Sequence, residues 1–146
     1  MSMDFFNTAD KAVRFSINNR GWRRIYLLGL MFGWVLQGTT TPPGWSGEKP
    51  WDAQNYSTNE GQVVTEADAL ELAKAIAQAI PLLKPPEAMN APQPVGFMWE
   101  LELFQRFGQA MENGVRDPGY IFFDARWSDK LNELVAFCQK GAFKIC

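Results

Sequence analysis

Apolar residues recur at helical spacing in four stretches of this chain, and this pattern predicts four helices. Before the second stretch, Thr65 is a good N-cap. Asp68 follows three residues later, in the first turn of the helix, where a carboxylate interacts favourably with the positive end of the helix dipole. The apolar residues that come next share one helical face: Ala69, Leu72, Ala73 and Ile76. We therefore expect a helix over about residues 66–80, ended by Pro81.

The same reasoning predicts helices over about residues 20–32, over about 97–112, and from residue 124 or 128 to about 140. Large apolar side chains mark the inner faces of these helices. The predicted core consists of Trp22, Tyr26, Leu72, Ile76, Leu101, Phe104, Leu131, Leu134, Val135 and Cys138.

Signals for strands are weaker. Residues 1–17 carry little pattern and are expected to form a short helix or a docked arm. Residues 34–37 can form a short strand, and residues 143–145 can pair with 62–64 or with 34–37. The predicted fold is thus mainly α: about four helices around one core, a long Gly/Pro/Trp-rich loop and a few very short strands, in a single globular domain spanning residues 1–146.

The long loop covers residues 38–60, where prolines and glycines exclude a regular element. Loops longer than about 12–15 residues are uncommon inside compact domains and are often functional. This one carries Trp45, Trp51 and Tyr56. Two interpretations stay open: the rings form a surface that binds a partner, or they fold back over the core as a lid.

Composition excludes several kinds of chemistry. The chain has no His, so it cannot build a Ser-His-Asp triad, a Cys-His pair or a His-based zinc site. The net charge of −2 argues against nucleic-acid binding through a broad basic surface. Arg20, Arg23 and Arg24 are a local exception, which we interpret as a solvated helix face rather than a phosphate site. Cys138 is expected to be buried and Cys146 exposed. No cofactor and no metal are predicted.

An apolar run at Ile25–Leu36 follows Arg23 and Arg24, as in a signal peptide. Its 12 residues fall short of the roughly 17–25 needed to span a bilayer, and the cleavage pattern of small residues is missing. We therefore expect a buried helix, a cytoplasmic protein and no membrane partner.

Carboxylates offer a second candidate site. Asp68 and Glu71 are three residues apart and so lie on one face at the start of the 65–80 helix. Carboxylates are also expected there because of the helix dipole alone. A ligand site or an acid–base pair at this position is the alternative to binding through the loop.

Three motifs, taken together, make this chain resemble a known group of proteins. They are a Trp22-Arg23-Arg24 start followed by Gly-Trp and Gly-Thr, a Gly61-Gln62-Val63-Val64 segment before an Asp68-Ala69-Leu70 helix, and a Phe137–Phe143 ending. In these the chain resembles a group of small uncharacterised bacterial proteins to which no activity is assigned. The resemblance covers most of the chain and implies a structure rather than a reaction. Some small proteins of this style act as immunity or accessory proteins beside toxins, an analogy of size and style.

From these observations we expect a non-enzymatic intracellular interaction or accessory protein that binds a protein partner through the aromatic 38–60 loop. The alternative is a small-molecule-binding protein or enzyme that uses the carboxylates of the 65–80 helix. A third interpretation, binding to a membrane surface through residues 20–36, follows from the basic and apolar run.

Overall fold

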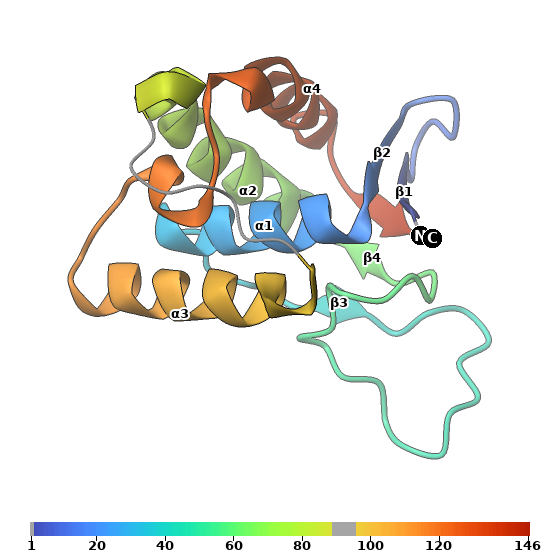
Figure 1. Cartoon of the computed structure of the whole chain (residues 1–146). Coiled ribbons are helices and arrows are strands. Elements are labelled where there is room, and N and C mark those ends of the chain that lie inside the picture. Colours follow the sequence, from blue (N-terminus) through green and yellow to red (C-terminus); the bar gives the residue numbers. More distant parts are fainter. Residues whose placement is uncertain (1, 89–95) are drawn as a thin grey trace.

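The computed structural model describes residues 2–88 and 96–146, and in this part of the chain it has an α/β fold (Figure 1). Four helices lie beside one five-stranded antiparallel sheet. The helices are α1 (Asn19–Met31), α2 (Glu66–Ala79), α3 (Trp99–Glu112) and α4 (Ser128–Cys138). The strands are β1 (Ser2–Asn7), β2 (Arg14–Asn18), β3 (Thr39–Thr40), β4 (Val63–Val64) and β5 (Phe143–Ile145).

The expectation of a mainly α fold with a few trivial strands is wrong. The main cause is the N-terminal segment, which forms the hairpin β1–β2 instead of a short helix or a docked arm. Along β1, Met3, Phe5 and Asn7 are buried while Asp4 and Phe6 are half-buried on the other face. This is the two-residue period of a strand, but the adjacent pair Phe5-Phe6 hides it in the sequence because one Phe occupies each face.

The strand order of the sheet is β2-β1-β5-β4-β3, so the last strand of the chain, β5, lies in the middle and joins the two halves of the sheet. β5 pairs with β1 through Phe5 and Ile145 and with β4 through Val64 and Phe143. Of the two pairings predicted for residues 143–145, the one with 62–64 is therefore confirmed and the one with 34–37 is wrong. Residues 34–37 form no strand, and the short strand in this region is β3, which pairs with β4. The two ends of the described chain consequently lie side by side (Figure 1).

All four predicted helices are present, with ends close to those expected. Asn18 caps α1 by accepting a hydrogen bond from the Gly21 N–H at 2.7 Å. Thr65 caps α2 by accepting from the Asp68 N–H at 3.4 Å, as its position in the sequence predicts. None of the helices in the described residues is long and apolar enough to cross a membrane.

Aromatic rings fill the space between the inner face of the sheet and the helices. The Phe5 ring packs edge-on against Trp22 of α1, with ring centroids 4.7 Å apart, and lies 5.0 Å from the Phe143 ring. Phe137 of α4 joins the same cluster at 5.3 Å from Phe143. Truncating a buried aromatic of this kind costs about 3–5 kcal/mol, so this cluster is a main source of stability.

Most of the predicted core residues are buried, with two clear errors on α3. Leu101 is 52% exposed and Phe104 is 46% exposed. The helix has two apolar faces, and the one that packs inward carries Trp99, Leu103 and Ala110. Tyr26 and Val135 are half-buried at the edge of the core. The confirmed core residues are Trp22, Leu72, Ile76, Leu131, Leu134 and Cys138.

Candidate functional site

The 38–60 loop leaves the body of the protein between β3 and β4 and projects into solvent (Figure 1). Its two ends are joined because Thr39 pairs with Val64 and Thr40 with Val63. Two parts of the loop differ in their surroundings. We call the part around Tyr56 and Gly38 the base, and the part around Trp45 and Trp51 the tip.

The base is held by a buried hydrogen-bond network. The carboxylate of Asp68 has no exposed surface, and it accepts from the indole N–H of Trp34 at 2.9 Å and from the Tyr56 hydroxyl. The same Tyr56 hydroxyl accepts from the Gly38 N–H at 2.8 Å. Gly38 has a φ of +104°, which favours glycine. The network therefore joins the start of the loop, its return and the first turn of α2.

Trp34 reaches this network because Gly29 leaves room for it. A Cβ at Gly29 would lie 2.9 Å from Trp34 Cε3 and 3.0 Å from Leu72 Cδ1, closer than side chains tolerate. The indole of Trp34 then packs edge-on against the Tyr56 ring, with centroids 5.4 Å apart. Gly29 thus allows the indole of Trp34 to approach α1 closely.

Burial shifts the pKa values of the titratable side chains at the base of the loop. It raises the pKa of Asp68, with the hydrogen bonds from Tyr56, Gln37 and Trp34 acting in the opposite direction. Burial and the hydrogen bond to Asp68 raise the pKa of Tyr56. Burial also raises the pKa of the Cys138 thiol, which makes that thiol unreactive. Because Asp68 and Tyr56 are closed off from solvent, the base serves to anchor the loop.

A second anchor lies on the returning part of the loop. Gln62 is fully buried, and its side-chain N–H₂ donates to the carbonyls of Thr58 at 2.6 Å and Asn55 at 3.2 Å. Its Oε1 accepts from the Glu60 N–H at 2.9 Å. Trp22 adds a bond from its indole N–H to the Tyr56 carbonyl at 2.6 Å. Sequence reasoning missed Trp34 and Gln62 as anchors. Trp34 bonds to Asp68, 34 residues away, and no local pattern marks such a partner. The partners of Gln62 lie within 7 residues, but they are backbone groups, which residue types do not single out.

The tip carries the two remaining aromatic residues of the loop. Trp45 and Trp51 meet edge to face, with ring centroids 4.9 Å apart and planes at 77°. Trp45 is 38% exposed, and its indole N–H donates to the Lys49 carbonyl at 3.1 Å. The Trp51 indole N–H donates to Thr39 Oγ1 at 3.1 Å. The tip therefore presents an ordered pair of indoles at the surface.

The five predicted site residues thus separate into three places. Trp45 and Trp51 form the tip, while Tyr56 and Asp68 bond to each other in the base. Glu71 is exposed on α2. Asp68 and Glu71, predicted to share a face, do not form a common open site.

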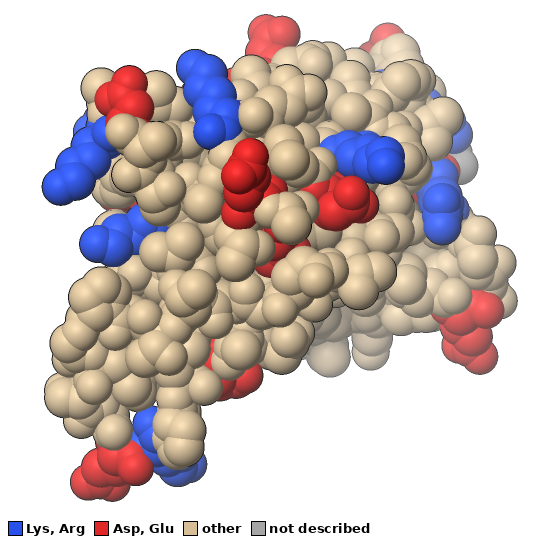
Figure 2. Space-filling model, turned by 180° about the vertical axis from the view of Figure 1, so that it is seen from behind, with Lys and Arg blue, Asp and Glu red and all other residues tan. Residues whose placement is uncertain are grey.

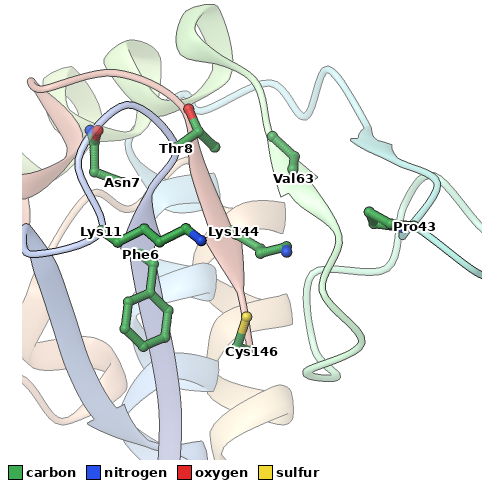
Figure 3. Close-up of a pocket in the computed structure, with 8 residues that line it drawn as sticks. All are labelled: Phe6, Asn7, Thr8, Lys11, Pro43, Val63, Lys144 and Cys146. Atoms are coloured by element: carbon green, nitrogen blue, oxygen red, sulfur yellow. The ribbon is translucent and has the colours of Figure 1, made fainter.

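The outer face of the sheet carries a groove with a volume of about 500 Å³. Figure 3 shows its lining, which comes from β1, the β1–β2 connection, β4, β5 and the start of the 38–60 loop. The ammonium groups of Lys11 and Lys144 are directed across it toward Val63 and Pro43 (Figure 3). The sequence gives little signal for this groove because its residues are spread from one end of the chain to the other. Its lining residues are Phe6, Asn7, Thr8, Lys11, Pro43, Val63, Lys144 and Cys146.

Charge is unevenly distributed over the surface. Figure 2 shows charged side chains across the upper half of the back face and at the end of the projection at the lower left. The area between them is mostly uncharged (Figure 2). Over the ranges that the structure describes, no group of three or more Cys, Asp or Glu side chains is placed to hold a metal ion.

Comparisons of the sequence with protein-family models and with curated proteins, and of the fold with solved structures, gave no match.

Proposed function

We propose that this chain is a non-enzymatic interaction protein of the cytoplasm and that it binds a protein partner through the tip of the 38–60 loop. The observation that carries the proposal is the pair of exposed Trp45 and half-buried Trp51, held edge to face on a projecting loop. Tryptophan is enriched among the residues that dominate binding energy at protein interfaces.

The base of the loop supports this proposal through its rigidity. Binding by a disordered loop loses free energy to the ordering of its backbone and side chains. Here the buried bonds of Tyr56, Asp68 and Gln62 order the ends of the loop before any partner arrives. The tip is therefore presented in advance, and more of its contact energy is available for affinity.

The surroundings of the tip also suit a protein partner. The wide area with few charged side chains in Figure 2 leaves a partner few charges to desolvate. Following the sequence resemblance, a toxin produced beside this protein is the candidate partner, which would make the chain an immunity or accessory protein. Identifying the neighbouring genes would test that step.

The alternative, a ligand site or an enzyme using Asp68 and Glu71, has less support. Both oxygens of the Asp68 carboxylate already accept hydrogen bonds, and the side chain has no exposed surface. A ligand could reach it only by opening the base.

Capture of partners by the immobilised protein, quantified by mass spectrometry, tests the proposal. A specific partner should bind to the wild type and be lost from Trp45→Ala and from Trp51→Ala, with a drop in affinity of about 30-fold or more. The matched control is Leu82→Ala, which truncates an apolar side chain that is 46% exposed outside the loop. Retention of the partner by both tryptophan variants would reject the loop as the binding element.

A further inference from the structure

The groove on the outer face of the sheet follows a single row of cross-strand neighbours. Phe6 of β1 stands opposite Lys144 of β5, and Lys144 stands opposite Val63 of β4. Side chains directly opposite each other in antiparallel strands lie on one face and within contact distance. The row therefore alternates apolar and cationic groups, and Pro43 lies beyond Val63 at the far side (Figure 3).

Positive charge is concentrated here without a matching acid. In the ranges that the structure describes, neither Lys11 nor Lys144 forms an ion pair, and Arg14 stands next to Phe6 on β2. Three cations thus gather on one face of a chain whose net charge is −2. Like charges held close together raise the free energy of the folded protein unless something neutralises them.

Two carboxylates close by in the sequence, those of Asp4 and Asp10, accept hydrogen bonds from neutral donors. Asp4 Oδ1 accepts from the Ser16 hydroxyl at 2.6 Å, and Asp10 Oδ1 accepts from the Ala12 N–H at 3.0 Å. Neither belongs to the lining of the groove, whose described residues include no acidic side chain. The side chains that line the groove therefore include two ammonium groups and no carboxylate.

The other polar side chains of the lining, Asn7 and Thr8, already form hydrogen bonds within the protein. The Asn7 side chain donates to the Lys140 carbonyl at 3.0 Å and accepts from the N–H groups of Ala9 and Asp10. The Thr8 hydroxyl donates to the Ala142 carbonyl at 3.3 Å. These bonds fix the wall from which Lys11 extends. They leave the two lysines as the main groups able to bind a ligand.

From this combination we propose that the groove binds a small amphiphilic carboxylate. The two carboxylate oxygens bond to the ammonium groups of Lys11 and Lys144, and the apolar body lies along Phe6, Val63 and Pro43. Charge-assisted bonds of this type are about twice as strong as neutral ones. A volume of about 500 Å³ is within the range typical of small-molecule sites.

A carboxylate fits better than a bare anion for two reasons. Lysine ammonium groups act as separate point charges, so each can meet one oxygen of the carboxylate. The remaining contact groups, Phe6, Val63 and Pro43, offer only apolar surface, which an inorganic ion would leave unused. Both halves of the ligand are therefore needed for affinity.

Titration with three probes tests the proposal: 2-naphthoate, the neutral 2-naphthamide and inorganic phosphate, each followed by two-dimensional ¹H–¹⁵N NMR at low ionic strength. We expect 2-naphthoate to shift the amide signals of Phe6, Thr8, Val63 and Lys144, with binding that weakens as salt is added. Naphthamide and phosphate should bind at least about tenfold more weakly, since each supplies only one half of the interaction.

Three variants locate the binding. Lys11→Gln and Lys144→Gln should each weaken 2-naphthoate binding about tenfold. Lys74→Gln makes the same charge change at an exposed position on α2 outside the groove and should have no effect. The thermal midpoint of each variant checks that the fold is kept.

Several results would overturn the proposal. They are equal binding of naphthamide, equal binding of phosphate, full affinity in the lysine variants, and shifts confined to residues outside the groove. Because the groove and the tip are probed separately, loss of partner capture in the Trp45→Ala variant would not change the outcome of this titration.

Discussion

The base and the tip of the 38–60 loop use the same kind of residue for opposite purposes. Tyr56 in the base is fully buried, and its hydroxyl is bonded on both sides, to Gly38 and to Asp68. Trp45 at the tip is 38% exposed, and its ring packs against two other loop residues, Trp51 and Gly47. The difference teaches that an aromatic-rich loop need be neither wholly a lid nor wholly a binding surface.

Both interpretations that the sequence left open are therefore present in one segment. The base is bonded to the first turn of α2 through a carboxylate, whereas the indole N–H groups of the tip donate to acceptors within the loop, on Lys49 and Thr39. Stability should depend on the base and partner binding on the tip. Four substitutions or conditions test this separation, in order of decreasing effect on stability.

The largest effect is expected for Asp68→Ala. The change leaves the buried Tyr56 hydroxyl and the Trp34 indole without the carboxylate, and the free energy of unfolding should fall by about 3 kcal/mol. Urea unfolding measures this. The matched control is Glu71→Ala, three residues along the same helix but exposed, which should change stability by less than about 0.5 kcal/mol. Equal losses in both variants would contradict the anchor.

The next effect is expected for Tyr56→Phe, which keeps the ring and removes the hydroxyl. Gly38 then loses its acceptor and Asp68 loses a donor, so unfolding should become easier by about 2 kcal/mol. The unfolding midpoint in urea, compared with that of the Asp68→Ala variant, measures the loss. If the double variant Asp68→Ala/Tyr56→Phe loses as much free energy of unfolding as the two single variants added together, the two residues do not act as one network.

A smaller, pH-dependent effect follows from the raised pKa of Asp68. The folded state binds this proton more tightly than the unfolded state. The stability that Asp68 contributes is therefore full below its ordinary pKa of 3.8 and is lost as the pH rises through the higher folded value. Asp68→Asn removes this titration, so the variant should gain stability relative to the wild type as the pH rises from 4. Unfolding in urea at several pH values measures the difference, and a constant difference from pH 4 to 7 would contradict the raised pKa.

The smallest effect on stability is expected for Trp45→Ala. Its ring contributes one edge-to-face contact at an exposed position, so the free energy of unfolding should change by less than about 1 kcal/mol. Differential scanning calorimetry measures this change. A loss as large as that of Asp68→Ala would mean that the tip belongs to the core and would remove the distinction between the two parts of the loop.

The helices show how far the sequence alone could go. On α4, the residues Leu131, Leu134 and Cys138 fall on one face, and all three are buried as predicted. On α3, Leu101 and Phe104 follow the same kind of spacing and are about half exposed. Spacing identifies an apolar face, but α3 has two such faces, and only its packing against the rest of the protein chooses between them.

The sheet was harder to predict for a related reason. Period-two alternation is present in β1, but in six residues it is interrupted by the pair Phe5-Phe6 and gives a weak signal. What makes this segment a strand is its pairing with β2 and with β5, more than a hundred residues away. A pattern search within a short window cannot detect such a partner.

The candidate sites divide in the same way. Trp45, Trp51, Tyr56 and Asp68 could be selected from the sequence by residue type and position. Their separation into a tip and a base required the fold. The groove with Lys11 and Lys144 could not be predicted, because its lining joins the first and last strands.

By itself, the sequence determined the positions of the four helices, the cap of α2, the long interrupted loop and the absence of histidine chemistry. All of these depend on composition or on residues within about four positions of each other, where backbone preference and side-chain spacing act directly. The tertiary structure alone decided the five-stranded sheet, the buried face of α3, the burial of Asp68 and the gathering of cations on one face of the sheet. These follow from contacts between distant segments, whose free energy depends on which surfaces the whole chain can bury together.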